Sequence, residues 1–386
     1  MAALRAASAR SGLGPEVSFV AQPQDFARGW PHPSLVSGAG LKTALTDSFQ
    51  RGLQFSSESL NYGDARGGFR FGHPRFLEAL ARFLEVQYGA AVDPSTLMAT
   101  AGASMGADLA IRALGRAGDV CVFEEPSYFL AFAMARDSGL ECQGVPILRD
   151  GIDLEALEDV CKASGGKVKF VYTIPVHQNP TGYTISNEKR ARLVELAAKY
   201  DFLLIADEAY QLLNFEPTGV KPLFYHDHAE HPRVLSVGTL SKLIGPGLKV
   251  GWVQAHRPLL KKLGDVGWIA SGSNPVIFSS MGLVDFMDSG KLAKHIQDVS
   301  ADLRDRRNFV CQKLRALDFE FDEPKGGYFV WVKARGRKTG RSGESLTIHQ
   351  DKFQDYMRLC FSWLSKAQME EGLEYLREAD CETNAG

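Results

Sequence analysis

The sequence lacks the features that would place the chain in several broad classes of protein. Its six cysteines are scattered, without a CxxC pair or a short Cys/His cluster, so we expect reduced thiols and no metal site. The net charge of −2 leaves no basic excess for nucleic acid. No apolar run is long enough to span a bilayer as a helix. We therefore expect no nucleic-acid or membrane partner, and a small-molecule site becomes the default.

Residues 1–14 contain arginine, serine and alanine but no acidic residue. This composition is typical of the start of an organellar transit peptide, and it fits a plain flexible terminus equally well. We expect a cytoplasmic protein, with a mitochondrial or plastid location as the alternative.

A series of apolar runs predicts the fold class. The runs are rich in Val, Ile and Phe and do not alternate with polar residues, which is typical of strands buried on both faces. They cover residues 120–125, 168–175, 202–208, 233–238 and 249–255. Helical patterns lie between them, such as 186–200 with Ser186 as its N-cap. This alternation predicts an α/β three-layer sandwich with a mostly parallel central sheet.

The pattern changes after about residue 290, where we expect a smaller α+β domain. A charged helix at residues 295–317 is followed by a strand pair, 319–324 with 326–334. A further strand at 356–364 and a final helix at 365–379 complete the domain. Residues 336–345 are predicted to form a loop. We divide the chain into a flexible extension (residues 1–14), an N-terminal arm (15–70), a large cofactor-binding domain (71–288) and the small domain (289–386).

Polar side chains follow the apolar runs. The carboxyl ends of parallel strands meet at one edge of the sheet, where ligands bind. The side chains expected there are Tyr128, Asn179, Asp207 with Tyr210, and the group Thr239, Ser241 and Lys242. In addition, the turn formed by Gly102, Ala103 and Ser104 precedes a helix whose amino end favours phosphate.

This set of residues fits pyridoxal 5'-phosphate. A lysine in a partly dry site, such as Lys242, can form a Schiff base with an aldehyde. Asp207 would keep a pyridine nitrogen protonated. Asn179 and Tyr210 could donate hydrogen bonds to the ring oxygen, and Tyr128 could stack on the ring. Each feature alone has a plainer explanation, as a turn, a helix cap or a solvated lysine, and only their order and spacing favour the cofactor.

The same motifs resemble those of fold type I pyridoxal-phosphate aminotransferases of classes I and II, over nearly the whole chain. The matching segments are Asn-Pro-Thr-Gly at 179–182, Asp-x-x-Tyr at 207–210, the lysine motif at 239–251, and the downstream segments PKGGYFVW and MRLCFS. The subgroup most resembled acts on 2-aminoadipate and aromatic amino acids. The resemblance implies amino transfer from an amino acid to a 2-oxo acid through an internal aldimine of Lys242.

The resemblance also implies roles for individual residues. Lys242, Asp207 and Tyr210 would be catalytic. Arg358, Asn179 and Trp30 would bind the substrate, with Arg358 pairing with its carboxylate. The cofactor would contact Gly102, Ala103, Ser104, Tyr128, Asn179, Asp207, Tyr210, Thr239, Ser241, Lys242 and Lys249, together with Tyr62 of a neighbouring subunit. A homodimer with shared sites is therefore expected.

Three departures from the family pattern are present. Lys249 stands where the family has an arginine, Ala103 stands where a hydroxyl residue is common, and the region of 336–345 is short. The motifs leave open other reactions of the same cofactor, namely those of carbon–sulfur lyases, decarboxylases and cyclopropane-forming synthases. A non-catalytic cofactor-binding module is a further alternative, although no helix-turn-helix segment is recognisable. A nucleotide-binding protein would need a GxGxxG turn or a P-loop, and the sequence contains neither.

Overall fold

The computed structural model describes residues 25–62, 68–334, 340–349 and 351–383. The predicted extension at residues 1–14 lies outside the described residues. The division of the chain into an arm and two domains stays a prediction. Within the described ranges, no helix is both long and apolar enough to cross a membrane.

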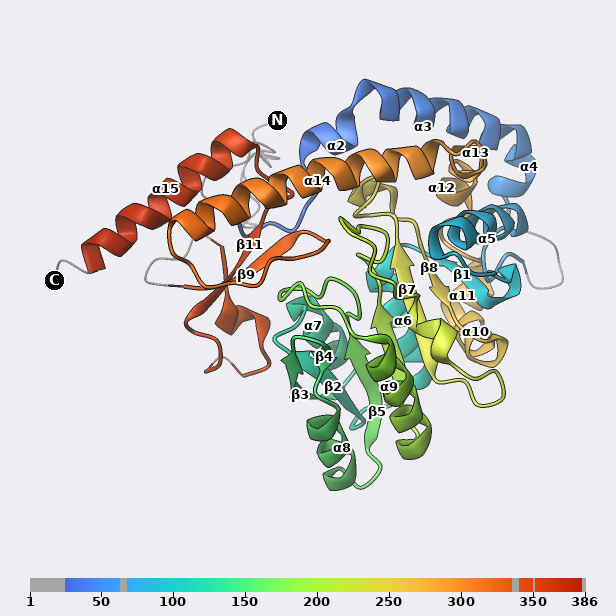
Figure 1. Cartoon of the computed structure of the whole chain (residues 1–386). Helices are drawn as coiled ribbons and strands as arrows, with labels where there is room; N and C mark the ends of the chain where they lie inside the picture. The colour runs from blue at the N-terminus through green and yellow to red at the C-terminus, as the bar shows by residue number, and fades with distance from the viewer. Residues whose placement is uncertain (1–24, 63–67, 335–339, 350, 384–386) are drawn as a thin grey trace, which may run out of the picture.

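A large sheet dominates the fold (Figure 1). Its eight strands run in the order β1-β8-β7-β6-β5-β2-β3-β4. Their bounds are β1 Leu97–Thr100, β2 Val120–Glu125, β3 Glu141–Leu148, β4 Gly151–Ile152, β5 Val168–Thr173, β6 Leu203–Asp207, β7 Val234–Thr239 and β8 Gly251–Gln254. Strands β3, β2, β5, β6 and β7 are parallel. Strand β8 runs antiparallel to both of its neighbours, and β4 runs antiparallel to β3.

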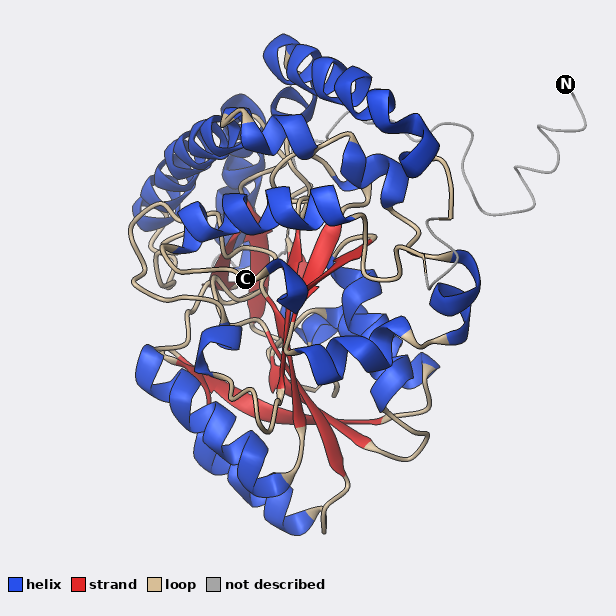
Figure 2. Cartoon of the chain, turned by 90° about the vertical axis from the view of Figure 1, so that its right-hand side faces the viewer, coloured by secondary structure: helices blue, strands red, loops and turns tan. Residues whose placement is uncertain are grey.

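Helices pack on both faces of this sheet, as Figure 2 shows. Alternate residues of one strand enter different apolar cores: Phe170 and Tyr172 pack in one, and Val171 in the other. The helices between or beside the strands are α5 Pro74–Tyr88, α6 Ala103–Leu114, α7 Phe129–Asp137, α8 Leu154–Ala163, α9 Asn187–Tyr200, α10 Arg257–Gly264, α11 Gly267–Gly272, α12 Ile277–Met281 and α13 Val284–Asp288. The predicted three-layer α/β class is confirmed, because continuous apolar strands need cover on both sides.

Helix α9 begins as the sequence predicts. The Ser186 hydroxyl oxygen accepts a hydrogen bond from the Lys189 amide, so one of the free amides at the helix start has a partner. Arg190, one turn into the helix, is fully buried. It donates to the carbonyls of Ile185, Lys221 and Pro175. These bonds hold the loop that follows β5, which carries Asn179.

A small sheet and further helices complete the fold (Figure 1). A three-stranded antiparallel sheet has the order β10-β11-β9. Its strands are β9 Phe329–Lys333, β10 Arg341–Ser342 and β11 Tyr356–Cys360. The helices are α2 Pro33–Ser37, α3 Ala39–Gly52, α4 Ser56–Ser59, the long α14 Lys291–Ala316 and α15 Lys366–Thr383. Short 3₁₀ turns are η1 Leu53–Phe55, η2 Pro94–Thr96, η3 Leu223–His226, η4 Pro246–Leu248 and η5 Gly343–Leu346.

Two sequence expectations were wrong in this part of the chain. Residues 319–324 do not form a strand, and only Phe321 makes an isolated bridge, to Val332. Asp322 pairs with Arg149 instead, and Pro324 has no amide to donate to a ladder. The loop predicted at 336–345 in fact contains β10, where Arg341 and Ser342 pair with β11, and most of η5. Residues 335–339 lie outside the described ranges.

Candidate active site

A cavity of about 510 Å³ lies at the carboxyl edge of the large sheet. Nearly all of the residues that the sequence singled out line it, although they come from distant segments. They are Trp30, Gly102, Ala103, Ser104, Tyr128, Asn179, Asp207, Tyr210, Thr239, Ser241, Lys242, Lys249 and Arg358. The carboxyl ends of β2 and β5, between which the strand order reverses, flank this cavity, as expected for an open parallel sheet.

Tyr62 is the exception. Its side chain is 71% exposed and does not line this cavity.

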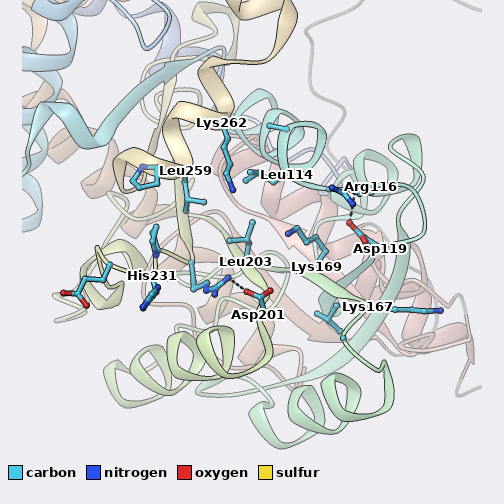
Figure 3. A pocket seen from close by; sticks show the side chains of 18 residues that line it. Leu114, Arg116, Asp119, Lys167, Lys169, Asp201, Leu203, His231, Leu259 and Lys262 are labelled. Carbon is cyan, nitrogen blue, oxygen red and sulfur yellow. Dashed lines mark hydrogen bonds and ion pairs between the residues drawn. The ribbon is translucent and has the colours of Figure 1, made fainter.

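A larger cavity, of about 810 Å³, lies at the opposite edge, where β2, β5 and β6 begin (Figure 3). Its lining includes Arg116, Lys167, Lys169 and Lys262. Several of its charged groups already have partners in the wall: Arg233, for example, lies 2.5 Å from Asp201. The smaller cavity is the better candidate, because buried reactive side chains converge there.

One corner of the smaller cavity is suited to an anion. Gly102 caps helix α6 with a φ of 89°, a conformation that favours glycine. The helix begins at Ala103, so Ala103 and Ser104 form its first turn, whereas the sequence analysis placed them before the helix. The Thr239 hydroxyl donates to the Ser241 hydroxyl at 2.9 Å. A Cβ at Gly102 would lie 3.5 Å from both hydroxyl oxygens. The hydroxyls of Thr239 and Ser241 and the unpaired amides at the start of α6 therefore lie together in what we call the Gly102 corner, or anion corner.

Lys249 reaches the same corner because β8 is reversed. Gly251, the first residue of β8, pairs with Thr239 at the end of β7. The segment before β8 therefore lies at the edge where the parallel strands end. Lys249 is exposed there and has a left-handed backbone with a φ of 51°, which is uncommon for a residue with a side chain.

Lys242 extends into the cavity from the turn after β7. Its ammonium donates to the carbonyl of Gly29 at 2.8 Å. The Tyr328 hydroxyl donates to the Lys242 carbonyl at 2.6 Å and holds the turn. Burial lowers the pKa of Lys242 to about 8, and the nearby charge of Arg358 acts in the same direction. A substantial fraction of this amine is therefore neutral near physiological pH.

Asp207 ends β6 and faces the cavity. Its carboxylate accepts a hydrogen bond from the Tyr172 hydroxyl at 2.6 Å and one from the Ala209 amide at 3.2 Å. Burial raises the pKa of Asp207, and the Tyr172 hydrogen bond opposes this shift. The sequence analysis missed Tyr172, which lies inside an apolar run. A hydroxyl in a strand buried on both sides needs a polar partner, and that was the available signal.

Arg358, on β11, closes the other end of the cavity. Its guanidinium donates to the Asn179 side-chain oxygen at 2.9 Å and to the Ala27 carbonyl at 2.6 Å. It also lies 4.1 Å from the centre of the Phe329 ring. Burial lowers the pKa of Arg358 to about 10. Its Nε is buried and has no hydrogen-bond partner in the described part of the chain.

The aromatic residues complete the wall. Tyr210 packs against the rings of Tyr328 and Phe329. Tyr128 stands at the start of α7. Trp30 is 41% exposed, and its ring meets that of Trp363 edge to face. The cavity thus combines a low-pKa amine, a buried carboxylate, a buried guanidinium and an anion corner.

The pattern of class I and II aminotransferases matches residues 44–376, which is most of the chain. The chain belongs to the class I and II aminotransferases. This aminotransferase is 30% identical to "Aromatic-amino-acid aminotransferase 1" of Thermococcus litoralis, with 84% of this chain and 80% of the relative covered.

Other similar proteins differ in their described function. A solved kynurenine aminotransferase of Pyrococcus horikoshii, in complex with PMP, superposes with a TM-score of 0.81 at 26% identity, covering 93% of this chain and 90% of that chain. An uncharacterised HTH-type transcriptional regulator of Bacillus subtilis is 26% identical over 74% of this chain, which spans 61% of the regulator.

The family implies pyridoxal phosphate as cofactor, and the cavity fits it. A Cβ at Gly102 would lie in contact with the hydroxyl oxygens of Thr239 and Ser241, at 3.5 Å from each, so the glycine leaves this space open to a ligand. Lys242 offers an amine, and Asp207 offers a carboxylate without a cationic partner among the described ion pairs. No described residue fills the space between them.

The titration of Lys242 is the first prediction. Its lowered pKa means that its neutral amine appears at lower pH than that of an ordinary lysine. We expect labelling of the apo-enzyme with an amine-specific reagent, measured by peptide mass spectrometry, to rise through about pH 8 at Lys242. In Arg358→Met, the loss of a neighbouring positive charge moves this rise to higher pH. An unchanged profile in Arg358→Met would contradict the electrostatic coupling, and exposed lysines in the same digest report the reagent's own pH dependence.

Proposed function

We propose that this cavity is where the enzyme transfers an amino group between an amino acid and a 2-oxo acid, with pyridoxal phosphate bound there. The observation that carries the proposal is the convergence of Lys242, Asp207 and the Gly102 corner in one cavity. When bound, the cofactor supplies an aldehyde and an electron-withdrawing ring. The residues of the chain position it and move the proton.

Lys242 is proposed as the residue that holds the cofactor covalently and carries a proton at Nζ. Its pKa of about 8 suits both tasks, because proton transfer is most efficient when the pKa of the group lies near the working pH. Asp207 would keep the ring nitrogen charged, and Tyr172 would keep Asp207 oriented through their 2.6 Å bond. Asn179 and Tyr210 are proposed to donate to the ring oxygen, and Tyr128 to cover the ring face.

Arg358 is proposed as the residue that binds the substrate carboxylate. A guanidinium holds a carboxylate through two parallel hydrogen bonds. The Asn179 side chain and the Ala27 carbonyl fix the orientation of Arg358. Its Nε still needs a partner, which a bound carboxylate would supply. Trp30, which also lines the cavity, would form part of the substrate wall.

A homodimer with shared sites is proposed from the surface around Tyr62. Large apolar side chains are exposed on the contacting elements η1, α4 and α12 or at their ends, namely Leu53, Leu60 and Phe278. An apolar surface of this kind favours contact with another protein. In the proposed dimer, the hydroxyl of Tyr62 reaches the phosphate bound by the partner subunit.

Replacing Lys242 tests the proposed function. We expect Lys242→Ala to lower amino transfer by at least about 1,000-fold, because both the covalent anchor and the proton carrier are lost. The assay follows transfer from a panel of amino acids to 2-oxoglutarate and pyruvate, with Lys261→Ala as a control on an exposed lysine. Full turnover in Lys242→Ala would reject the proposal. Release of carbon dioxide or a thiol by the unmodified enzyme, without a new amino acid, would indicate another reaction of this cofactor.

Lys249 can be tested by cofactor affinity. Lys249→Arg is expected to tighten pyridoxal phosphate binding to the apo-enzyme several-fold, because arginine presents two parallel N–H groups to a phosphate in a fixed fork, whereas lysine presents a flexible point charge. Lys249→Ala and Lys249→Gly should both weaken binding, and glycine accepts the left-handed backbone without strain. Equal weakening in the two variants would assign the effect to the lost ammonium, since only glycine changes the backbone strain, and unchanged affinity in both would show that Lys249 does not bind the phosphate. Fluorescence titration measures the dissociation constants.

Mixing of variants tests the shared site. Tyr62→Phe should weaken phosphate binding and lower activity, while Lys242→Ala is inactive. In mixed dimers, one of the two sites would combine an intact Lys242 with an intact Tyr62. Refolding the two variants together should restore up to about a quarter of the wild-type activity for random pairing. An activity equal to the average of the two separate variants would show that Tyr62 does not act across an interface.

A further inference from the structure

The charges that line the cavity do not balance. Its cationic side chains are Arg28, Lys242, Lys249, Arg341 and Arg358, whereas Asp207 is the one carboxylate among the lining residues. Arg28 already pairs with Asp25 at 2.5 Å. The proposed function uses Lys242, Lys249 and Arg358. Arg341 is left with a positive charge in the cavity and no assigned role.

Arg341 lies directly beside Arg358. The two residues are paired across the antiparallel strands β10 and β11. Side chains opposite each other on such strands point to the same face, about 5 Å apart at Cβ, and like charges there are destabilising. The charge of Arg341 contributes to the lowered pKa of Arg358. The two neighbouring guanidiniums therefore repel each other, and a bound anion would offset this repulsion.

The contacts around the Arg341 guanidinium leave it able to donate hydrogen bonds to a ligand. Its guanidinium lies 4.1 Å from the centre of the Phe129 ring, as that of Arg358 lies on Phe329. Its Nε is buried without a hydrogen-bond partner in the described ranges. No described carboxylate forms an ion pair with it. Each arginine thus has one face on an aromatic ring and a buried Nε–H group that a ligand could bind.

The segment that follows Arg341 is anchored to the large sheet. Glu125, at the end of β2, accepts hydrogen bonds from the Ile348 amide at 2.9 Å and the Lys352 ammonium at 2.6 Å. The Ser127 amide donates to the Leu346 carbonyl at 2.8 Å. These bonds lie close to Tyr128, which lines the cavity. Arg341 is therefore held at the cavity wall by backbone pairing on one side and this anchor on the other.

We propose that Arg341 determines substrate specificity by binding a second anionic group, a distal carboxylate, on a substrate whose first carboxylate is bound by Arg358. This inference rests on the proposed function and narrows its substrate class to dicarboxylic amino acids and 2-oxo acids. Because Arg341 and Arg358 are paired on adjacent strands, their side chains share one face of the small sheet, and the two carboxylates of one short substrate could reach both. The rings of Phe129 and Phe329 provide apolar walls for its methylene groups.

The test compares two acids that differ in one group. Glutarate has a distal carboxylate where pentanoate has a methyl group. We expect the holoenzyme to bind glutarate at least about tenfold more tightly in calorimetric titrations, because a charge-assisted hydrogen-bonded pair is added. Arg341→Gln should lose this preference and keep its affinity for pentanoate. Arg341→Lys should restore part of it, since the charge returns without the planar fork.

Steady-state kinetics give a second measurement. In Arg341→Gln, the KM for 2-oxoglutarate should rise at least about tenfold with little change in kcat, while pyruvate kinetics stay unchanged. Arg28→Gln is the matched control, because it removes another cation from the same cavity. If Arg28→Gln loses the glutarate preference and Arg341→Gln keeps it, the proposal is wrong. Absence of any preference in the unmodified holoenzyme would also overturn it.

The two proposals fail in different ways. A glutarate preference that depends on Arg341, in an enzyme that transfers no amino group, would reject the proposed function and leave the anion site standing. Amino transfer that does not distinguish 2-oxoglutarate from pyruvate, with or without Arg341, would reject the specificity proposal alone.

Discussion

Lys242, Asp207 and Arg358 carry ionisable groups inside the protein, where each loses much of its hydration. Burial acts on all three, lowering the pKa values of Lys242 and Arg358 and raising that of Asp207. The structure offsets this cost with a few hydrogen-bond partners, among them the Gly29 carbonyl for Lys242, the Tyr172 hydroxyl for Asp207, and Asn179 for Arg358. These partners also fix the direction of each group, so stability and function depend on the same contacts.

These groups and their partners come from distant parts of the chain. The segment around Gly29 lines the cavity and is held there by three hydrogen bonds. Its Ala27 carbonyl binds Arg358, its Gly29 carbonyl binds Lys242, and its Trp30 carbonyl accepts from Ser362. The small sheet contributes Arg358 and Arg341 from adjacent strands. The active site is therefore assembled between the N-terminal segment, the large sheet and the small sheet, and no one of them forms it alone.

Most of the fold was predictable because its signals are local. Apolar runs marked β2, β5, β6 and β7 to within two residues at either end, since a strand buried on both faces cannot include many polar residues. The cap at Ser186 was equally local. The predicted strand at 319–324 was wrong. Its alternation of apolar and acidic residues resembles a strand, but Pro324 and outward-facing acidic side chains prevent a ladder of backbone hydrogen bonds. The sequence also gave no sign that Arg341 lies in a strand, because β10 has only two residues and a strand of that length is too short to show a periodic pattern.

The candidate site was predictable to a similar extent and for a related reason. Strand ends in a parallel sheet meet at one edge, so Tyr128, Asn179, Asp207 and Lys242 could be assigned to one cavity from their positions alone. The roles of these residues stay predictions. Tyr172 was missed because its partner, Asp207, lies on the neighbouring strand.

The identity of the reactive groups and the edge at which they gather follow from residue type and strand order, and both can be read from the sequence. What surrounds those groups depends on tertiary packing. The reversal of β8 brings Lys249 to the anion corner, and the pairing of β10 with β11 places a second arginine beside Arg358. Contacts between residues far apart in the chain leave no spacing rule in the sequence, because they depend on how separate elements pack.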